Sequence, residues 1–333
     1  MHGPTNTHPS FAAAVLIAAL LALLCPPAAS AATSVERVGE SASSVLDHWT
    51  AARMRAAEPA PAPSPSLAAG RSSADANEPG GAPSYVPAAA PGDGAGGAAL
   101  RSGAPEPMRG PLPGDTRDEV TDPAAPEVSA HGKVFFTVPS GEEAGDYVCS
   151  GTAVNSRNRS VVWTAGHCVL PETSSSFVTN WIFVPGHSAD SQPYGQWTAK
   201  RLATTGPWQE SRNIKYDLGA AVVRRTAEGG RLGEVVGGRG IGFDQPRDHL
   251  YRAFGYPAVP SPSAPLEFDG DREFRCTSRP LGTDNPGTSG PPTTSIECDM
   301  TGGSSGGGWI VDSTLLSVTS YGYQLELDAL YGP

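Results

Sequence analysis

The sequence runs Gly302-Gly303-Ser304-Ser305-Gly306-Gly307-Gly308 between the apolar residues Met300 and Trp309. A glycine-serine run is often a solvated linker, but linkers seldom have apolar residues on both sides. A serine between glycines can stand on a tight backbone turn, where the N–H groups of Gly303 and Ser305 converge on one point. The run therefore predicts a nucleophilic serine, Ser305, beside an oxyanion hole formed by Gly303 and Ser305.

Two upstream segments contain the partners that such a serine needs. Thr164-Ala165-Gly166-His167-Cys168 includes a histidine, and Tyr216-Asp217-Leu218-Gly219-Ala220 places a carboxylate before an aliphatic run. A serine hydroxyl is a weak nucleophile until an imidazole takes its proton, and a buried carboxylate must hold that imidazole in one tautomer. We therefore expect Ser305 as nucleophile, His167 as general base and Asp217 as the group that orients it.

The segment Gly303-Ser304-Ser305-Gly306-Gly307 also fits the nucleophile elbow of the α/β-hydrolases. In that fold the catalytic histidine follows the serine in the chain. None of the seven histidines lies after Ser305, so this interpretation fails.

At these residues the chain resembles the chymotrypsin-like serine endopeptidases, and most closely their secreted bacterial branch of trypsin-like and glutamyl-endopeptidase-like enzymes. The motifs lie within residues 128–322. The resemblance implies an all-β fold of two six-stranded antiparallel β-barrels with the active site in the cleft between them. His167 and Asp217 would belong to the first barrel and Ser305 to the second. It also implies an acyl-enzyme mechanism, which requires neither a metal nor an organic cofactor.

Short alternating or apolar runs, bounded by turn residues, agree with an all-β domain. They lie at residues 133–138, 147–154, 160–163, 177–184, 218–223, 251–254, 274–276 and 315–320.

The resemblance also implies substrate contacts. Ser320, Tyr321 and Gly322 would line the primary specificity pocket and contact the substrate backbone. Asp299 precedes Ser305 by the spacing at which trypsin-like members place an acid at the pocket base. It would select Arg or Lys there, or face solvent if the loop is threaded differently. Members that cleave after glutamate usually carry His where this chain has Thr319, so the residue preference stays open between basic and acidic.

Four cysteines follow the N-terminal region, namely Cys149, Cys168, Cys276 and Cys298. An even number in an exported chain favours disulfides, with three possible connectivities. The family pairs Cys149 with Cys168, which leaves Cys276 for Cys298. A zinc site is disfavoured because the cysteines do not form Cys-x-x-Cys pairs, and we expect no metal site.

The first 126 residues differ in composition from the rest. Residues 1–31 predict a signal peptide, which contains the short apolar stretch Phe11 to Leu24 and the cysteine Cys25. Residues 32–126 predict a largely disordered pro-region or, alternatively, a surface linker, with one amphipathic helix at Ser34 to Ala57. Residues 127–333 form the expected protease domain.

The residue before the proposed nucleophile and the C-terminal end of the chain differ from those of the animal members. Those carry Asp where this chain has Ser304, and that Asp pairs with a newly cut N-terminus. We therefore expect a zymogen released by simple cleavage between Thr121 and Ala130, without this ion pair. Members also end in a helix, for which no residues remain after Tyr331.

The sequence thus predicts a secreted, monomeric serine endopeptidase that acts on peptides or proteins. The net charge is −11, and no basic patch indicates nucleic-acid binding. We expect no membrane contact once the signal peptide is removed. The alternative is a catalytically silent homologue that uses the cleft only for binding. Such proteins usually lack a triad residue, and none is missing here.

Overall fold

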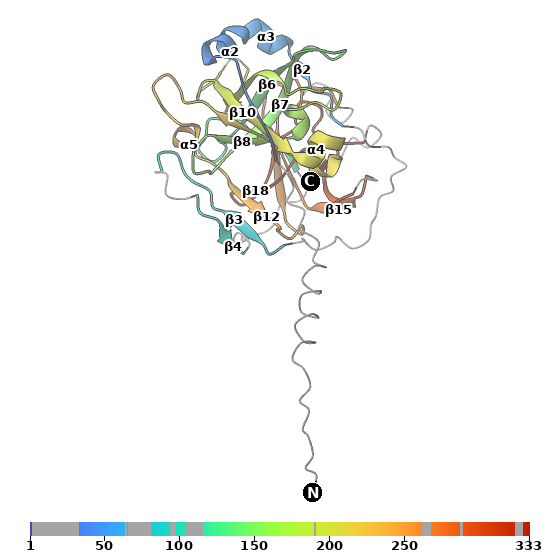
Figure 1. Cartoon of the computed structure of the whole chain (residues 1–333). Helices are drawn as coiled ribbons and strands as arrows, with labels where there is room; N and C mark the ends of the chain where they lie inside the picture. Colours follow the sequence, from blue (N-terminus) through green and yellow to red (C-terminus); the bar gives the residue numbers. More distant parts are fainter. Residues whose placement is uncertain are drawn as a thin grey trace. The chain divides into compact units, whose positions relative to one another are not determined.

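The computed structural model describes residues 1, 33–63, 65, 81–93, 98–103, 116–189, 191–261, 268–286, 289–323 and 329–333. Contacts divide the chain into two units, Met1–Ala32 and Thr33–Pro333. The predicted signal peptide lies outside the described residues except for Met1. The second unit is built mostly of β-strands (Figure 1).

The elements fall into three groups along the chain. Upstream of the barrels lie β1 (Thr33–Arg37), α2 (Ala42–His48), α3 (Ala51–Ala56), β2 (Glu58–Pro59), β3 (Ser84–Val86), β4 (Arg101–Ser102) and β5 (Thr116–Glu119). The first half contains β6 (His131–Val138), β7 (Gly145–Val154), β8 (Val161–Thr164), η2 (Gly166–Cys168), β9 (Thr179–Pro185), β10 (Trp197–Thr205), α4 (Gly206–Ser211), η3 (Ile214–Tyr216) and β11 (Gly219–Val223). The second half contains α5 (Leu232–Val235), β12 (Gly240–Phe243), β13 (Tyr251–Gly255), β14 (Phe274–Ser278), β15 (Pro280–Asp284), β16 (Thr293–Glu297), β17 (Gly308–Val311), β18 (Thr314–Val318) and β19 (Ala329–Gly332).

The first half closes into a six-stranded antiparallel barrel. Its strands follow the order β10, β11, β8, β7, β6 and β9, and β9 pairs with β10 to close the ring. Alternate side chains of β6 point to opposite faces, as in any strand. Val134 and Phe136 pack in the main apolar cluster with Trp181 and Leu202, whereas Phe135 belongs to a separate cluster. The barrel is therefore apolar inside and carries a second apolar patch around Phe135.

The second half surrounds another apolar core. One sheet has the order β4, β3, β12, β18, β17, β13, β14 and β5, and a smaller sheet has the order β15, β16 and β19. Ile296 of β16 and Leu330 of β19 share one cluster with Tyr251, Phe274 and Trp309 of the larger sheet. Among the larger sheet's pairings, only β12 with β18 is parallel. The structure confirms the expected all-β fold of two barrels, the first closed by hydrogen bonds and the second formed from two sheets.

The upstream region differs from its expected single helix. Residues Thr33–Arg37 form β1 on the outer side of β10. Two short helices follow, because the side chains of Ser41 and Thr50 accept N–H groups of Ser44 and Arg53 and so begin each helix. In the described parts of the stretch expected to be largely disordered, β2 to β5 form instead by pairing with the barrels or each other.

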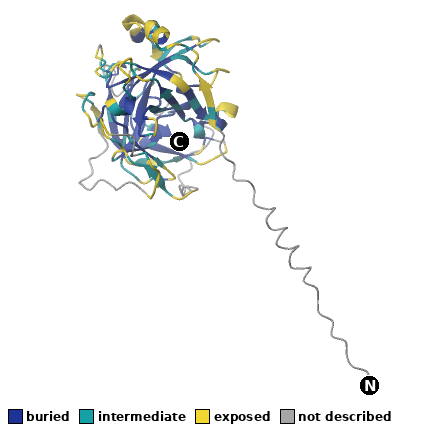
Figure 2. Cartoon of the chain, turned by 60° about the vertical axis from the view of Figure 1, so that its left-hand side comes forward, coloured by how far each residue is buried: buried dark blue, intermediate teal, exposed yellow. Residues whose placement is uncertain are grey.

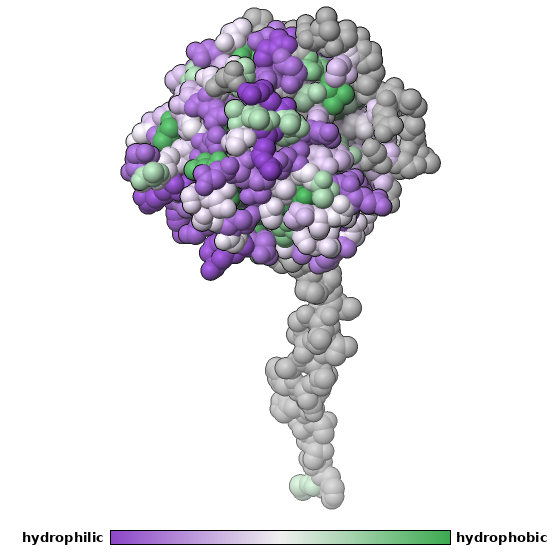
Figure 3. All heavy atoms as spheres, turned by 90° about the horizontal axis from the view of Figure 1, so that it is seen from above, coloured by the Kyte–Doolittle hydropathy of each residue, from purple (hydrophilic) through white to green (hydrophobic). Residues whose placement is uncertain are grey.

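Burial follows this architecture. The buried residues concentrate in the strands, and the exposed ones in loops and on the outer sides of α2 and α3 (Figure 2). The face in Figure 3 is mostly hydrophilic, with hydrophobic residues in small separate spots. Among the described residues, no helix is long and apolar enough to cross a bilayer.

Candidate active site

His167 lies on the single turn of η2, directly after β8, and is 1% exposed. Its Nδ1 is 2.8 Å from Oδ2 of Asp217, and its backbone N–H donates to Oδ1 of the same carboxylate at 2.8 Å. A carboxylate can only accept, so Nδ1 carries a hydrogen, and in the neutral imidazole Nε2 presents its lone pair. Nε2 is buried and has no hydrogen-bond partner among the described residues. This is the tautomer that a general base needs.

The absence of a side chain at Gly166 allows His167 and Asp217 to make these two hydrogen bonds. A Cβ on Gly166 would lie 2.8 Å from Oδ1 of Asp217 and 2.8 Å from Cδ1 of Trp208. The Trp208 ring stands edge-on to the His167 ring at 6.5 Å. Any larger residue here would push the histidine turn away from the carboxylate.

Asp217 follows η3, immediately before β11, as expected from the sequence. It is fully buried and accepts a third hydrogen bond, from Oγ of Ser320 at 2.6 Å. A buried carboxylate stays charged only with such partners. Ser320 was expected only to contact the substrate backbone, and no signal in the sequence indicated its side-chain contact with Asp217.

Ser305 lies in the loop between β16 and β17, and this loop packs against the histidine turn. The carbonyl of Ser305 accepts from the N–H of Ser150 at 2.7 Å and lies 3.8 Å from Sγ of Cys168. A Cβ on Gly306 would be 2.0 Å from Oγ1 of Thr164. Ser305, 3% exposed, is therefore adjacent to the segment that carries His167.

The two expected oxyanion donors belong to peptides with fixed carbonyls. The carbonyl of Gly302 accepts from Ala258 N–H at 2.7 Å, and that of Ser304 accepts from Gly307 N–H at 2.9 Å. In a trans peptide the N–H points opposite to the carbonyl. The N–H groups of Gly303 and Ser305 are thus oriented, and they donate to no described residue.

The expected substrate strand has an edge with available groups. Both backbone polar groups of Tyr321 pair with Tyr331, and its ring is buried in an aromatic cluster. The carbonyl of Ser320 and both backbone groups of Gly322 have no hydrogen bond to a described residue. Alternate residues of a strand present their groups to opposite sides. Ser320 and Gly322 can therefore pair with a substrate backbone, whereas that of Tyr321 is already used.

Two expected pocket residues have other contacts in this structure. Asp299 forms an ion pair with Arg117 of β5, and its side chain is 12% exposed. Oγ1 of Thr319 accepts from Nε1 of Trp309 at 3.0 Å, and Thr319 is buried. Asp299 thus neither faces open solvent nor presents an unpaired charge.

Both expected disulfides form. Cys149 of β7 pairs with Cys168 of the histidine turn, and Cys276 of β14 pairs with Cys298. In the described part of the chain, the only cluster of potential metal ligands is Cys149, His167 and Cys168. Its two sulfurs are joined to each other, so neither is a thiolate, and this cluster does not fit a zinc site.

A buried carboxyl that the sequence analysis did not identify lies near the hydroxyl of Tyr256. Glu273 is 1% exposed, and its Oε1 has no hydrogen-bond partner among the described residues. Its Oε2 is 3.5 Å from the hydroxyl of Tyr256. Burial raises the pKa of Glu273 to about 8, against the opposing effects of Arg239, Tyr256 and Arg275.

A separate cavity of about 550 Å³ shares no residue with this site. Its lining includes five basic residues, Lys200, Arg201, Arg224, Arg225 and Arg231. Three of them already donate within the chain: Arg224 to the Glu40 carbonyl, Arg225 to the Gly229 carbonyl and Arg231 to Glu234. The sequence had indicated no such gathering of positive charge.

Comparisons with known proteins found local matches to curated sequences and longer matches to solved structures. No protein-family model matches the chain. Two curated Bacillus proteins match locally: an extracellular metalloprotease of Bacillus subtilis, 34% identical over 74 residues, and a glutamyl endopeptidase of Bacillus licheniformis, 35% identical over 72 residues. Each match spans 22% of this chain and 22% of the relative.

Solved structures match over a longer range. The protease Anisep of Arthrobacter nicotinovorans is 36% identical, with a TM-score of 0.55, over 66% of this chain and 93% of that protein. The thermostable serine protease AL20 of an extremophilic microorganism is 33% identical, with a TM-score of 0.55, over 62% of this chain and 92% of that protein.

Proposed function

Because this chain belongs to the bacterial chymotrypsin-like serine proteases, we propose that it is an endopeptidase that cleaves peptides or proteins with a triad of His167, Asp217 and Ser305. The observation that carries the proposal is the His167 tautomer. Nδ1 is bound to the buried Asp217 carboxylate, which leaves the lone pair of Nε2 to accept a proton.

In the proposed reaction, Ser305 Oγ attacks the substrate carbonyl carbon and its proton passes to His167 Nε2. The carbonyl electrons move to the oxygen, which the N–H groups of Gly303 and Ser305 stabilise. The imidazolium then gives its proton to the leaving nitrogen as the C–N bond breaks. This step leaves an ester between Ser305 and the acyl group. Water hydrolyses the ester by the same steps, with His167 again as base.

Substitution of the nucleophile tests this proposal. The wild-type chain and Ser305→Ala are incubated with a mixed peptide library, and the products are sequenced to read the residue before each cut. A sulfonyl fluoride should modify Ser305 in the wild type but not in His167→Ala, because modification requires the activated hydroxyl. Ser313→Ala, which changes an exposed serine between β17 and β18, is the control and should cleave normally. A folded, processed wild type that cleaves nothing would favour the silent, binding-only homologue.

We also propose that residues 33–63 act as a pro-region. The apolar patch around Phe135 supports this, because the upstream helices cover it. Val45, Trp49 and Met54 are buried there against Phe135 and Ile182. The buried apolar contact holds the segment on the uncut domain.

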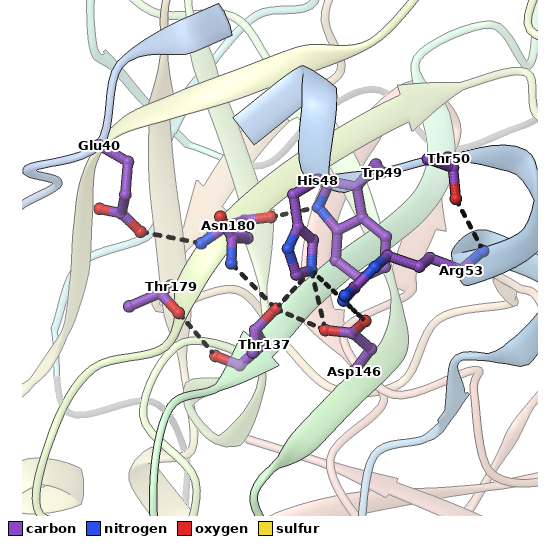
Figure 4. Close-up of polar contacts among 9 residues, drawn as sticks. All are labelled: Glu40, His48, Trp49, Thr50, Arg53, Thr137, Asp146, Thr179 and Asn180. Carbon is purple, nitrogen blue, oxygen red and sulfur yellow. Dashed lines mark hydrogen bonds and ion pairs between the residues drawn. The ribbon is translucent and has the colours of Figure 1, made fainter. Parts of the chain in front are cut away.

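Polar contacts fix the same helices around Asp146 of β7 (Figure 4). One carboxylate oxygen lies 3.0 Å from His48 Nε2 and accepts from Thr137 at 2.6 Å, and the other accepts from Arg53 at 3.0 Å. Nε1 of Trp49 donates to the carbonyl of Asn180. Side chains of the upstream segment and of the barrel thus meet on one carboxylate.

The end of this segment reaches the proposed active site. Ala60 donates its N–H to the carbonyl of Val148 at 3.0 Å, directly before Cys149. Ala60 and Pro61 line a cavity of about 40 Å³ together with His167. A Cβ on Gly302 would lie 3.2 Å from Cβ of Pro59. Residues 59–61 therefore lie beside His167 and Gly302, and we propose that residues 58–63 block substrate until the segment is cleaved or displaced.

Export is part of the proposal. Residues 1–31 would direct secretion and be removed, and the mature domain would begin after a second cleavage downstream. N-terminal sequencing of the protein recovered from culture medium tests both cuts. Retention of the whole chain inside the cell would contradict export.

A further inference from the structure

Ser150, at the middle of β7, is bonded to the Ser305 loop through two different atoms. Its Oγ donates to the carbonyl of Gly303 at 2.8 Å, and its backbone N–H donates to the carbonyl of Ser305 at 2.7 Å. Ser150 is 1% exposed. One residue of the first barrel therefore holds the carbonyls on both sides of Ser304, in the second half of the fold.

The hydroxyl of Ser150 has a defined direction. Tyr256 donates its backbone N–H to Oγ of Ser150 at 2.9 Å. A serine hydroxyl has a single hydrogen, and here the Gly303 carbonyl is the acceptor that takes it. The Ser150 hydroxyl thus accepts a hydrogen bond from the Tyr256 N–H and donates one to the Gly303 carbonyl.

This contact acts on the most adaptable part of the oxyanion loop. Gly303 has a φ of +97°, a region that only glycine adopts readily, and glycine also leaves it at little steric cost. Among the described residues, its N–H has no hydrogen-bond partner that would hold it in place. The Ala258 bond fixes the peptide before Gly303, and the Ser150 bond fixes the peptide after it. Both torsions of Gly303 are then determined.

Ser304 does not supply such an anchor across the two halves. Its Oγ donates to the carbonyl of Thr301 at 2.5 Å, within the same loop. The described contacts that link the loop to the first barrel come from Ser150, from Cys168 Sγ at the Ser305 carbonyl and from the packing of Gly306 on Thr164.

We propose that Ser150 is a positioning residue of the oxyanion hole, whose hydroxyl holds Gly303 so that its N–H faces the developing oxyanion. The proposal rests on the proposed endopeptidase function. Without the hydroxyl, the Gly303 carbonyl and the Tyr256 N–H are both buried and unpaired. The loop then gains by rotating about the Gly303 torsions to turn its carbonyl toward another partner. This rotation displaces the Gly303 Cα, so the N–H on the preceding peptide loses its alignment with the oxyanion.

Kinetics separate this role from a merely structural one. In Ser150→Ala, we expect kcat to fall about 10- to 100-fold with KM changed less than about twofold, because the oxyanion forms only in the transition state. Binding of a peptide boronic acid, which forms the tetrahedral adduct, should weaken by a similar factor. Ser150→Thr keeps the hydroxyl and should restore most of kcat. Ser150→Cys preserves the volume with a weak donor and should resemble Ser150→Ala, which covers the case of an alanine variant that does not fold.

Thr152→Val is the matched control. Thr152 lies two residues along β7, is equally buried, and its Oγ1 bonds to Nδ1 of His131 at 3.0 Å. It should lower thermal stability while kcat per folded enzyme stays unchanged.

Three results would overturn the proposal: an unchanged kcat in Ser150→Ala, an equal loss of kcat in Thr152→Val, or a crystal structure of Ser150→Ala with the Gly303 peptide unmoved. Ser305→Ala, measured in parallel, separates the two hypotheses. If Ser305→Ala is inactive and Ser150→Ala is normal, only the Ser150 role fails. If Ser305→Ala still cleaves, the endopeptidase proposal itself fails. Even in that case, the crystal structure of Ser150→Ala shows whether the Ser150 hydroxyl holds the Gly303 peptide in place.

Discussion

Oγ of Ser320 and Nδ1 of His167 both lie within 2.8 Å of one atom, Oδ2 of Asp217. Ser320 follows β18 in the second half of the fold, whereas His167 and Asp217 belong to the first barrel. A single carboxylate oxygen therefore ties the two halves together at the proposed active site.

Removal of the Ser320 hydroxyl should slow the reaction without weakening substrate binding. The Ser320 backbone remains in Ser320→Ala, so KM should change little. Because Asp217 loses a charge-assisted hydrogen bond worth about 2 kcal/mol, we expect kcat to fall roughly 30-fold. Steady-state kinetics on one peptide check this, with Ser320→Thr as the control that keeps the hydroxyl. A large rise in KM at normal kcat would contradict the expected role.

The two disulfides should differ in their effect on activity. Each closes a loop of similar size, with separations of 19 and 22 residues, so each pair of Cys→Ala substitutions should cost about 3 kcal/mol of stability. Loss of the Cys149–Cys168 bridge also frees the His167 turn, so kcat should fall further in that variant. Denaturant unfolding and kinetics at a temperature where both variants are folded separate the effects. Equal kcat in both variants would argue against a role of the Cys149–Cys168 bridge in holding the His167 turn.

Glu273 should make the protein less stable at alkaline pH. Its pKa is about 8 in the folded chain, above the ordinary value of 4.5, so the folded state holds the proton more tightly. This contribution to stability is complete below about pH 4.5 and is lost as the pH rises through about 8. The loss is at most about 5 kcal/mol, at roughly 1.4 kcal/mol per pH unit.

The variant Glu273→Gln tests this dependence, because a glutamine is neutral at every pH. The midpoint temperature of unfolding of Glu273→Gln, measured at about a dozen pH values between 5 and 9, should change less with pH than that of the wild type. At pH 5 the two proteins should be similar. A wild-type profile that rises toward pH 9 would contradict the shift.

Weakened docking of the upstream helices should release activity from the uncut chain. In Asp146→Asn the contacts from His48 and Arg53 lose their charged partner, so residues 58–63 should leave the active site more often. We expect peptide cleavage by the unprocessed variant to rise at least about 5-fold over the unprocessed wild type, since each lost charged contact shifts the docking equilibrium by about 1 kcal/mol. Asp118→Asn, at an exposed ion pair with Arg275, is the control and should change nothing. An unprocessed wild type that is already fully active would rule out the proposal that residues 58–63 block substrate.

The same docking should weaken in acid. Burial alone raises the pKa of Asp146, but the hydrogen bonds from Thr137 and His48 and the contact with Arg53 lower it below its ordinary value of 3.8. The stabilisation is therefore present above that value and is lost as the pH falls through the folded pKa.

Asp299 should contribute to stability more than to specificity. In a domain that retains β5, the Asp299 carboxylate is paired with Arg117, so Asp299→Asn should lose about 1–2 kcal/mol of stability and leave the cleavage preference unchanged. Sequencing of library products before and after the substitution checks this. A preference for Arg or Lys that disappears in Asp299→Asn would instead place the carboxylate in the pocket.

Local motifs predicted the centre of the molecule well. All eight apolar or alternating runs overlap strands, because each carries its own burial pattern. The strand β10 was missed, since Lys200 and Arg201 face outward in succession and interrupt its alternation. The upstream strands β1, β3 and β5 were missed because they form by pairing with β10, β12 and β14 rather than by an apolar pattern of their own.

Contacts between distant residues had no sequence signal. The acid at the Asp299 position matches a familiar spacing, but its partner Arg117 lies 182 residues away. The bond from Ser150 to Gly303 joins a side chain to a backbone carbonyl 153 residues along the chain. A motif states which side chains are present, whereas these bonds depend on how the two halves of the fold meet.

The division of the proposed triad between the halves has a consequence for biosynthesis. The ribosome makes the first barrel, with His167 and Asp217, before it reaches Ser305, Ser320 or the glycines between them. A growing chain therefore holds the proposed base without the proposed nucleophile, and a carboxylate that still lacks its Ser320 bond. On the proposed function, the order of synthesis would by itself keep the chain inactive until the second half has folded against the first.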